Sequence, residues 1–452
     1  MTAAAWVLRL YGVGNIGIRQ LLAPACCALA LALAPLSVRA DTVLDWNAVV
    51  LDVVRLMRLT PPMASRELAI VNTAAFDAVD AASGLPFRPY SYDGAGVPDA
   101  SPRVAAAAAA YRVLSRLEPG IAARAPALAA RMQALYERDT RGGEQAASIA
   151  AGIALGQQRA DAIIALRAHD GFDVSPPPFW GSAKPGAWRP TPPEMAPGLL
   201  PQWATMPPWA MRSPAQFRPP GPPPMGSAKW AGSVNMTQAL GSTGSRVRTA
   251  ERTQIALFWA DADGTETPPG HWIDIAAGIA AERHLELIDE ARLMALISTA
   301  VADAAIAAWD AKYIYNTWRP VTAISEAAAI GSTEVTPDRE WKPLLATPPF
   351  PEYISGHSTF SAAAAAILAR FFGSDRTSFS ARTDTPELRA VLRHFASFSA
   401  AAEEAGMSRI YGGIHFRFSH LDGLATGDAV GRYVFDNFFQ PQAAIATSFS
   451  AP

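Results

Sequence analysis

Apolar residues recur at helical spacing along most of this chain, and this pattern constrains the fold more than any other feature of the sequence. Between Asp45 and Gly84, the segment TPPMASRELAIVNTAAFDAV predicts a proline turn, a helix cap at Ser65 and an amphipathic helix. Further helices are expected near 103–117, 121–138, 143–168 and 248–259, through a long region to Ala323, up to Phe372, over 385–404 and from His420. Alternating strand patterns are scarce, so the sequence predicts an all-α protein built as one compact multi-helix domain or as two fused bundles.

Residues 174–225 interrupt the helical pattern with a segment rich in proline and tryptophan. Proline is excluded from helix interiors and central strands, which leaves an irregular backbone here. The aromatic content argues against a free linker, and we therefore expect an ordered loop wrapped over the helical body. We predict a single helical domain over 41–452, with an active-site bundle at about 248–440.

The first 40 residues have the composition of an export signal. Arg9 and Arg19 precede an apolar segment that ends in the small-residue cleavage pattern before Asp41. A membrane anchor or a lipoprotein attached at Cys26 fits less well, because prolines interrupt a short apolar run. The sequence therefore predicts a periplasmic or secreted protein without a stable membrane anchor.

Two compositional facts exclude whole classes of function. Both cysteines, Cys26 and Cys27, lie inside the predicted signal, so the mature chain would have no disulfide, thiol nucleophile or thiolate metal ligand. The formal net charge of −2 gives no reason to expect a nucleic-acid partner.

The first chemical motif is WDAKYIYNTWRPVTAI, which carries two long cations. Lys312 and Arg319 are seven residues apart, so both can project from one face of a helix that Pro320 ends at Arg319. Two cations among aromatic and apolar neighbours suit an anion. The alternative is a pair of solvated surface charges.

The second motif, PFPEYISGHSTF, lies where a proline-rich loop gives way to a helix. If Ser358 or Thr359 begins the helix, its free backbone N–H groups and positive dipole end face an anion. Gly356 would let that anion approach the backbone, and the Ser355 hydroxyl could donate to it. Ser355 lacks the flanking glycines of a nucleophile elbow, which excludes a serine hydrolase of that type. His357 is either a structural capping residue or an acid/base.

The third motif, SRIYGGIHF, separates Arg409 from His415 by a pair of glycines. A turn at these glycines could bring the guanidinium and the imidazole to a common point, although a lone histidine can also be a satisfied core residue. Together the three motifs supply three cations, a hydroxyl, a glycine amide and two histidines. This set suits a tetrahedral or trigonal-bipyramidal oxyanion.

The order and spacing of these motifs resemble the three-part signature of vanadium-dependent haloperoxidases. Type 2 phosphatidic acid phosphatases and bacterial class A acid phosphatases share that signature. The matching segments are Lys312-x6-Arg319-Pro320, Ser355-Gly356-His357 and Ser408-Arg409-x5-His415. The segments SRELAIVNTAAFDAV and FWADADGTETPPGHW also look like the bacterial haloperoxidase-like branch. The resemblance implies the multi-helix bundle architecture of this superfamily.

The resemblance also implies a role for each residue of the signature. The vanadate oxygens would be held by Lys312, Arg319, Ser355, Gly356 and Arg409. His415 would coordinate vanadium, and His357 would be the acid/base. Hydrogen peroxide would form a His-bound peroxovanadate, polarised most directly by Lys312, that oxidises a halide to hypohalous acid for a small organic acceptor. Phosphate may occupy the same site.

Four further residues are candidates through the resemblance. Trp309 and Phe350 occupy places where fungal-type chloroperoxidases have aromatic residues beside the halide, although ordinary core packing explains them equally well. Asp261 or Asp263 would be the carboxylate that pairs with the distal arginine in the family.

The sequence departs from the family pattern at two positions. Ile354 replaces the usual proline before Ser355, and Ser419 replaces an aspartate four residues after His415. Without that carboxylate to activate the histidine, a phosphohydrolase with His415 as nucleophile is the second hypothesis rather than the first. The third is a non-catalytic oxyanion-binding protein, which would not need His357.

Overall fold

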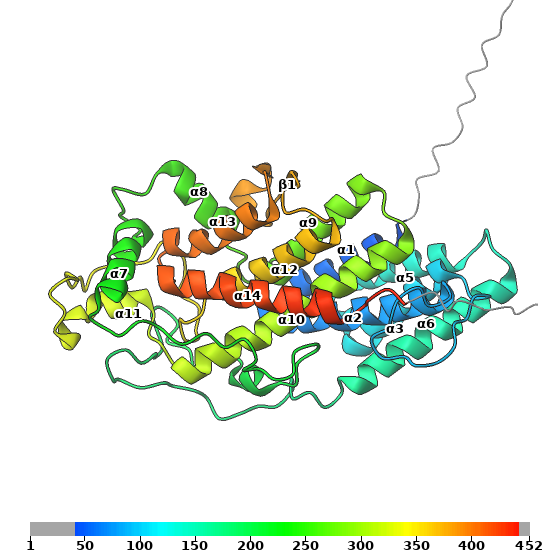
Figure 1. The fold of residues 1–452 in the computed structure, drawn as a ribbon, viewed down its shortest axis with the longest axis horizontal. Helices are drawn as coiled ribbons and strands as arrows, with labels where there is room; N and C mark the ends of the chain where they lie inside the picture. The colour runs from blue at the N-terminus through cyan, green and yellow to red at the C-terminus, as the bar shows by residue number, and fades with distance from the viewer. Residues whose placement is uncertain (1–40, 443–452) are drawn as a thin grey trace, which may run out of the picture. The chain divides into compact units, whose positions relative to one another are not determined.

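The computed structural model describes residues 41–442, and nearly all of its regular structure is helical. The first seven helices are α1 (Thr42–Met57), α2 (Pro61–Ala82), α3 (Pro102–Leu117), α4 (Ile121–Arg124), α5 (Pro126–Thr140), α6 (Ala146–Leu166) and α7 (Ala228–Gly241). The other seven are α8 (Ala250–Phe258), α9 (Thr267–Arg283), α10 (Leu287–Tyr315), α11 (Pro320–Ser325), α12 (Gly356–Phe371), α13 (Phe398–Tyr411) and α14 (Arg417–Asn437). Figure 1 shows their arrangement, and the all-α prediction is confirmed.

Little else in the described residues is regular. Three short 3-10 helices cover Pro201–Thr205, Ala327–Ile330 and Pro386–Leu388. Strands β1 (Phe379–Ala381) and β2 (Arg393–Phe395) form an antiparallel pair, with Phe379 opposite Phe395. From Asp41 onward the contacts group the chain into one compact unit. The predicted signal peptide, residues 1–40, lies outside the described residues.

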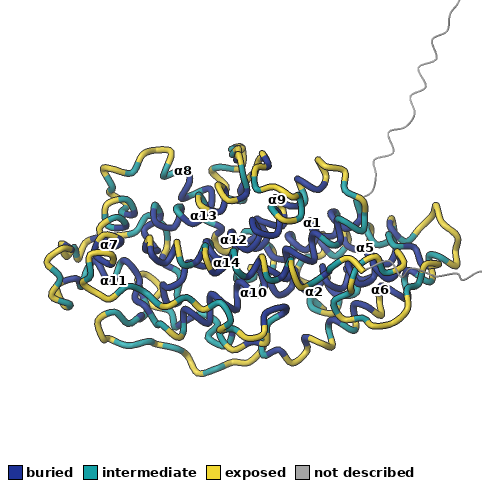
Figure 2. The backbone as a smooth tube through the Cα atoms, in the orientation of Figure 1, coloured by how far each residue is buried: buried dark blue, intermediate teal, exposed yellow. Residues whose placement is uncertain are grey.

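Helix α10 lies at the centre of this helical body and packs against α2, α12 and α14. It is the one helix in 41–442 long and apolar enough to cross a membrane, but 94% of that apolar window is buried inside the protein. Its backbone is dark blue in Figure 2 for most of its length. Burial of a continuous apolar helix on all sides is the expected state of a core helix in a large helical protein.

Helix α12 packs most extensively against α14, and glycine makes this close approach possible. Gly423, Gly427 and Gly431 recur every four residues on the face of α14 that meets α12. A Cβ atom at Gly427 would lie 2.2 Å from the carbonyl oxygen of Thr359. The two helices are therefore held at a separation that no larger residue permits, and this contact positions the start of α12.

The proline- and tryptophan-rich loop is ordered because its backbone is anchored to α10. The buried carboxylate of Asp303 accepts hydrogen bonds from three successive backbone N–H groups, those of Trp209, Ala210 and Met211, at 2.6 to 2.9 Å. Further upstream, the carbonyl oxygen of Leu199 accepts from the side chains of α10 described below. These charge-assisted bonds explain how an irregular segment can cover the helical body without secondary structure of its own.

Several element boundaries differ from the expectation. Ser65 does not cap a helix: α2 begins at Pro61 and Ser65 is buried within it. Helix α7 was not predicted, because its glycine- and serine-containing sequence has a weak apolar pattern. The expected helix over 385–404 is wrong in its first half, where β2 and a 3-10 turn precede α13.

Candidate functional site

The three sequence motifs converge on one buried point at the ends of four helices. Lys312 lies in the last turn of α10, Ser355 precedes α12, Arg409 lies near the end of α13, and His415 lies just before α14. Each of these four residues is at most 4% exposed. Burial lowers the pKa of His415 well below its usual value, and the charges of Arg319, Lys312, Arg409 and His357 lower it further. The charges of residues from all three motifs therefore act on the imidazole of His415.

Lys312 and Arg319 do not share a helix, contrary to the prediction. Helix α10 ends at Tyr315, Asn316 adopts a left-handed conformation, and Arg319 is the extended residue that precedes α11. Pro320 therefore begins a helix instead of ending one, which is the position where proline is best tolerated. The two cations still meet, since the charge of Arg319 lowers the pKa of buried Lys312.

Backbone carbonyl groups of the second motif hold both cations. Lys312 Nζ donates to the carbonyl oxygens of Pro351 at 3.2 Å and Glu352 at 3.1 Å, and also to that of Ile354. Arg319 Nε donates to the carbonyl oxygen of Phe350 at 2.9 Å. Ile354, which replaces the family's proline, is fully buried, and the peptide bond before it is cis. The segment 350–354 is thus the frame that orients the cations.

Helix α12 begins at Gly356, two residues earlier than the first predicted start, with Ser355 as its N-cap. The Ser355 oxygen accepts the Ser358 N–H at 3.5 Å, which leaves the hydroxyl proton free to donate to a ligand. A Cβ atom at Gly356 would meet only Phe360 and Trp309, at 3.6 Å and 3.9 Å. The protein itself does not require glycine there, but a ligand close to the backbone would. The positive end of the helix dipole faces the same point.

The turn of the third motif brings His415 to Arg319 instead of Arg409. Gly413 adopts a positive φ of 79° in this turn. His415 Nε2 lies 3.3 Å from Arg319 Nη1, whereas Arg409 Nη1 donates to the carbonyl oxygen of Trp259 at 2.9 Å. Arg409 is thus anchored at the end of α8 and acts on His415 through its charge.

Glu352 is the functional residue that the sequence analysis missed. Its Oε1 atom lies 2.8 Å from His415 Nδ1 and also accepts the Phe416 N–H at 2.9 Å. An ionised carboxylate only accepts, so Nδ1 carries the proton and Nε2 keeps a lone pair directed at the cations. Burial raises the pKa of Glu352 to about 7, although the Phe416 N–H and the charges of Arg319 and Lys312 oppose this. The signal was a single charged residue between apolar neighbours in PFPEYI.

The pairing with Glu352 changes the interpretation of Ser419. Ser419 is fully buried, and its carbonyl oxygen accepts the Ser355 N–H at 3.2 Å. It is Glu352 that holds His415, so the carboxylate absent at position 419 is supplied from another segment. A phosphohydrolase therefore cannot be set aside on the ground that the histidine lacks a carboxylate.

Of the two candidate aspartates, only Asp261 reaches the site. It is buried in the loop between α8 and α9, with Oδ2 at 3.5 Å from His357 Nε2 and Oδ1 at 3.0 Å from His271 Nδ1. It acts on Arg409 through charge, opposing the lowering of the arginine pKa by burial. Asp263 lies on the surface, where it pairs with Arg58.

Trp309 and Phe350 form an aromatic wall beside the cations. Their ring centroids are 5.1 Å apart, and the Phe350 ring lies 4.9 Å from Lys312 Nζ and 4.7 Å from the Arg319 guanidinium carbon. Trp309 Nε1 donates to the Leu199 carbonyl oxygen of the long loop at 3.2 Å, and the Tyr313 hydroxyl donates to the same oxygen at 2.7 Å. The wall is both packed core and one side of the site.

The donors left over at this point fit an oxyanion. Among the described residues, Arg319 Nη2 and Arg409 Nε are buried without a hydrogen-bond partner. Leaving such groups unpaired costs about 1–3 kcal/mol each. Vanadate or phosphate would satisfy both, together with the Ser355 hydroxyl and the N–H groups at the start of α12. The residues present therefore fit the group that the resemblance implies.

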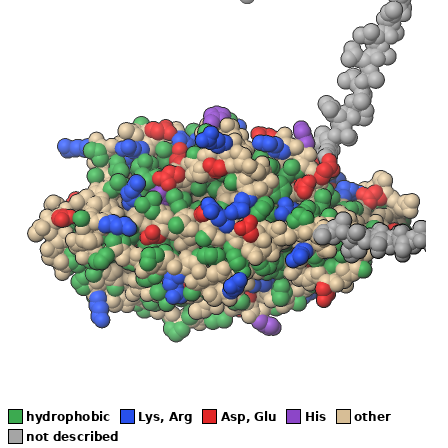
Figure 3. Space-filling view, viewed as in Figure 1, with side chains coloured by type: hydrophobic (Ala, Val, Ile, Leu, Met, Phe, Trp, Pro, Cys, Tyr) green, Lys and Arg blue, Asp and Glu red, His purple; other side chains and the backbone are tan. Residues whose placement is uncertain are grey.

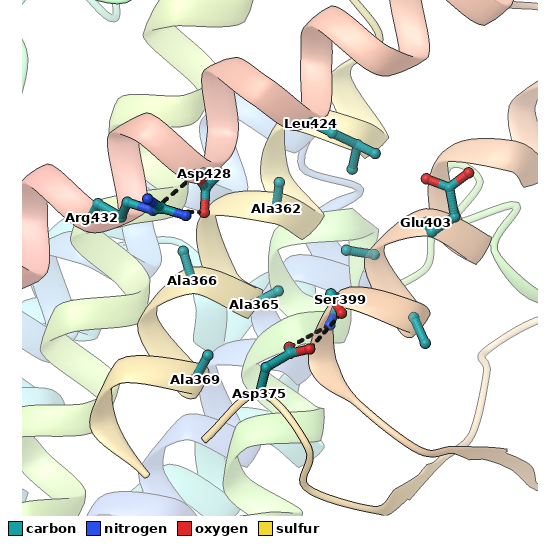
Figure 4. A pocket seen from close by; sticks show the side chains of 12 residues that line it. Ala362, Ala365, Ala366, Ala369, Asp375, Ser399, Glu403, Leu424, Asp428 and Arg432 are labelled. Atoms are coloured by element: carbon teal, nitrogen blue, oxygen red, sulfur yellow. Dashed lines mark hydrogen bonds and ion pairs between the residues drawn. The ribbon is translucent and has the colours of Figure 1, made fainter. Parts of the chain in front are cut away.

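Other surface features do not compete with this site. A groove of about 590 Å³, seen in Figure 4, lies between α12, α13 and α14, with Ala362, Glu403 and Leu424 in its walls. It is lined mainly by alanine methyl groups and does not include the site cations. Figure 3 shows basic and acidic side chains interspersed over the visible face. The concentrated positive charge is buried.

The site is thus a cluster of buried cations beside a histidine whose Nε2 atom faces Arg319, inside an all-helical body. A sequence profile of the VCPO second helical-bundle domain matches residues 292–442. The crystal structure described as the first bacterial vanadium-dependent iodoperoxidase is 30% identical, with a TM-score of 0.76 over 89% of this chain and 98% of that one. The chain belongs to the vanadium-dependent haloperoxidase family.

Two further relatives are more distant. Vanadium chloroperoxidase of Curvularia inaequalis is 27% identical over 235 residues, which is 40% of this chain and 38% of that protein. The matched segment thus spans little more than a third of the curated relative. A bacterial vanadium-dependent chloroperoxidase in its holo form is 20% identical, with a TM-score of 0.63 over 84% of this chain and 92% of that one, a likeness of fold.

Proposed function

We propose that this protein is a vanadium-dependent haloperoxidase that uses hydrogen peroxide to oxidise a halide. The observation that carries the proposal is His415, which is fixed by Glu352 at Nδ1 and presents Nε2 to a set of buried cations with unpaired donors. This is the arrangement that a histidine-bound oxyanion of vanadium needs. Family membership supports the same reading, and the names of two relatives refer to iodide and chloride chemistry.

In this proposal, vanadate binds in the pocket of the three motifs. Its oxygens would be held by Lys312, Arg319, Ser355, Gly356 and Arg409, with His415 Nε2 as the ligand to vanadium. Bound vanadate supplies a Lewis-acidic centre that activates hydrogen peroxide for attack by halide without a change of its own oxidation state.

The protein's own residues supply binding, charge and proton transfer. Lys312 and Arg319 stabilise developing negative charge on oxygen, because burial strengthens their field. Burial lowers the pKa of His357 to about 4, and the charge of Arg409 adds to this effect, so the ring is neutral near pH 7. A neutral imidazole can accept the proton of incoming peroxide and return it to a leaving oxygen. Phe350 and Trp309 would keep water from the halide side.

A phosphohydrolase is the second candidate, and the Glu352–His415 pair is the observation that favours it. A carboxylate at Nδ1 raises the nucleophilicity of Nε2, which could attack phosphorus while His357, when protonated in acid, gives its proton to the departing oxygen. Water would then cleave the phosphohistidine and restore the free imidazole. The same cations would hold the phosphoryl oxygens, since vanadate and phosphate share this geometry.

The test is to strip the mature protein with chelator and to measure halide oxidation and phosphate-ester hydrolysis with and without added vanadate. We expect oxidation of iodide, bromide or chloride that requires vanadate. Ester hydrolysis that vanadate inhibits, with no halide oxidation, would show that the phosphohydrolase is correct. Activity that survives His357→Ala would favour the non-catalytic pocket, and exposed His169→Ala is the matched control.

We also propose that the protein is exported, through the segment that precedes Asp41. N-terminal sequencing of protein from the periplasm or the medium tests this. Recovery of the intact N-terminus from the cytoplasm would contradict it.

A further inference from the structure

His271 is a buried histidine that none of the roles above explains. It lies in the first turns of α9 and is 0% exposed. Its ring stacks on Trp259 with centroids 4.6 Å apart, and Phe258 lies at 5.6 Å. Its Nε2 atom has no hydrogen-bond partner among the described residues. Packing alone does not explain a histidine here, because a phenyl ring would fill the same space without a buried nitrogen that lacks a partner.

Asp261 joins this histidine to the active site. Its two oxygens face different imidazoles, Oδ1 at 3.0 Å from His271 Nδ1 and Oδ2 at 3.5 Å from His357 Nε2. Asp261 adopts a left-handed φ of 44°, a conformation that costs a residue other than glycine on the order of 1 kcal/mol or more. The backbone is therefore held in an uncommon shape that places the carboxylate between the two rings.

The two imidazoles experience opposite surroundings. Burial disfavours a charged His271, but the charge and hydrogen bond of Asp261, with the charges of Glu266 and Asp274, outweigh it and raise its pKa to about 9. At His357, burial and the charge of Arg409 prevail over Asp261. Asp261 itself is ionised: burial opposes this, while His271 and then His357 lower its pKa.

We propose that His271 is a positioning residue for the acid/base histidine, and that it acts through Asp261 to keep His357 neutral and correctly oriented. This inference rests on the proposed function, because it assigns His357 the task of accepting a proton. The negative charge of Asp261 is balanced by His271 on one side and attracted by Arg409 on another. Without the positive charge of His271, the Asp261 carboxylate would favour protonation of His357. A protonated His357 could not accept a proton from the substrate.

The charged groups around His271, Asp261 and His357 are consistent with this assignment. Glu266, beside His271, is itself paired with Arg55 of α1 at 2.6 Å. Burial raises the pKa of Glu266 to about 8, although the charges of His271 and Arg55 oppose this, and Asp261 is the carboxylate that hydrogen-bonds His271. Arg409 donates to the Trp259 carbonyl oxygen at 2.9 Å, whereas His271 pairs with Asp261 at 3.0 Å.

The test uses the vanadate-free mature protein with 15N-labelled histidine and long-range 1H–15N NMR, which reports the protonation of each ring nitrogen. In the wild type, we expect His271 to remain an imidazolium above pH 8 and His357 to be neutral above pH 6. His271→Gln should raise the midpoint of His357 by about one pH unit, a tenfold change in its protonation constant. Exposed His169→Gln is the matched control and should leave the midpoint unchanged.

A double-mutant cycle separates positioning from a general structural effect. In the Asp261→Asn background, His271→Gln should shift the His357 midpoint by no more than about 0.3 units, because the link is already cut. An equal shift in both backgrounds would overturn the proposal. So would a neutral His271 at pH 7 in the wild type, an outcome that needs no variant to fold.

These measurements are made without vanadate, peroxide or halide. A protein that fails to oxidise halide could still show the expected shifts, and that result would refute the proposed function alone. If the protein oxidises halide but His271→Gln leaves the His357 midpoint unchanged, only the positioning role of His271 is refuted.

Discussion

Replacing Glu352 by glutamine is the most direct test of how the protein prepares His415. The variant keeps the shape of the side chain and an oxygen that can accept, but it removes the charge next to His415 Nδ1 at 2.8 Å and the Phe416 N–H at 2.9 Å. A hydrogen bond to a charged group contributes about 1.5–3 kcal/mol, and a neutral one about 0.5–1.5 kcal/mol. The hydrogen bond that holds His415 is therefore expected to weaken by about 1.4 kcal/mol. This corresponds to a tenfold loss of affinity for a ligand bound through Nε2, which is the lower end of the range for residues that hydrogen-bond metal ligands.

A second effect has the opposite sign and must be separated from the first. Loss of the Glu352 charge also removes an attraction on Lys312 and Arg319, so the pocket becomes more positive and every oxyanion binds better. This field acts on phosphate as well as on vanadate, whereas only vanadate forms a bond to the histidine nitrogen. The phosphate titration measures the effect of the field, and the ratio of the two affinities then reports the orientation of His415.

The assay is titration calorimetry of the chelator-treated protein with vanadate and with phosphate at pH 8, where Glu352 is ionised. Glu352→Gln should lower the preference for vanadate over phosphate about tenfold. The matched control is Glu403→Gln, in which another glutamate that pairs with a histidine, His420 at 3.1 Å, loses its charge outside the pocket. An unchanged ratio in Glu352→Gln, or the same change in both variants, would refute the reasoning.

Three further predictions follow from the same geometry. Lys312→Ala should reduce halide oxidation at least a hundredfold in turnover assays, because it removes a fully buried cation. The control Lys342→Ala, at an exposed position, should have no effect, and equal losses in the two variants would contradict the prediction. Phe350→Ala should raise the halide KM about tenfold and leave the peroxide KM unchanged, because it removes the ring that packs on both cations. His271→Gln should lose most stability below pH 6.5. The pKa of His271 is raised to about 9, so the stabilisation it provides is complete below its unfolded pKa and is lost as pH rises from about 6.5 through 9. Urea unfolding should show that the difference in free energy of unfolding between variant and wild type shrinks between pH 6 and pH 9.5, by at most about 3 kcal/mol. A difference that grows with pH would oppose the assignment.

Helical periodicity was sufficient to predict the fold class, because most of the helices bury a continuous apolar stripe. It failed where burial does not depend on such a stripe. Helix α7 has glycine or serine at three of its 14 positions, and the 385–404 segment contains β2 of a short hairpin, whose few residues show no period. The close contact of α12 and α14 depends on glycines spaced by four, which have no side chain to contribute to an apolar pattern.

The candidate site shows a similar division between local and tertiary information. The three motifs identify the residues that we propose to contact the ligand, since spacing within a segment restricts where their side chains can lie. Glu352 and His415 are 63 residues apart, and Asp261 and His357 are 96 apart, so no local pattern could pair them. The family comparison at Ser419 looked for a carboxylate at one position in the chain, whereas the physical requirement is an acceptor at Nδ1 from any direction.

The placement of these two carboxylates explains how the pocket can bury three cations and remain selective for an anion. Glu352 and Asp261 each pair with a histidine and not with Lys312, Arg319 or Arg409, and these three side chains have backbone carbonyl groups as hydrogen-bond partners. Carbonyl dipoles hold the cations in place but do not neutralise them, and the charges of Glu352 and Asp261 offset only part of their positive field. A carboxylate bound directly to Arg319 or Arg409 would have filled the positions that vanadate or phosphate oxygens need. We infer that the chain places its negative charge beside the two histidines that we propose to be catalytic, and that the proposed ligand would be the counter-ion of the cations.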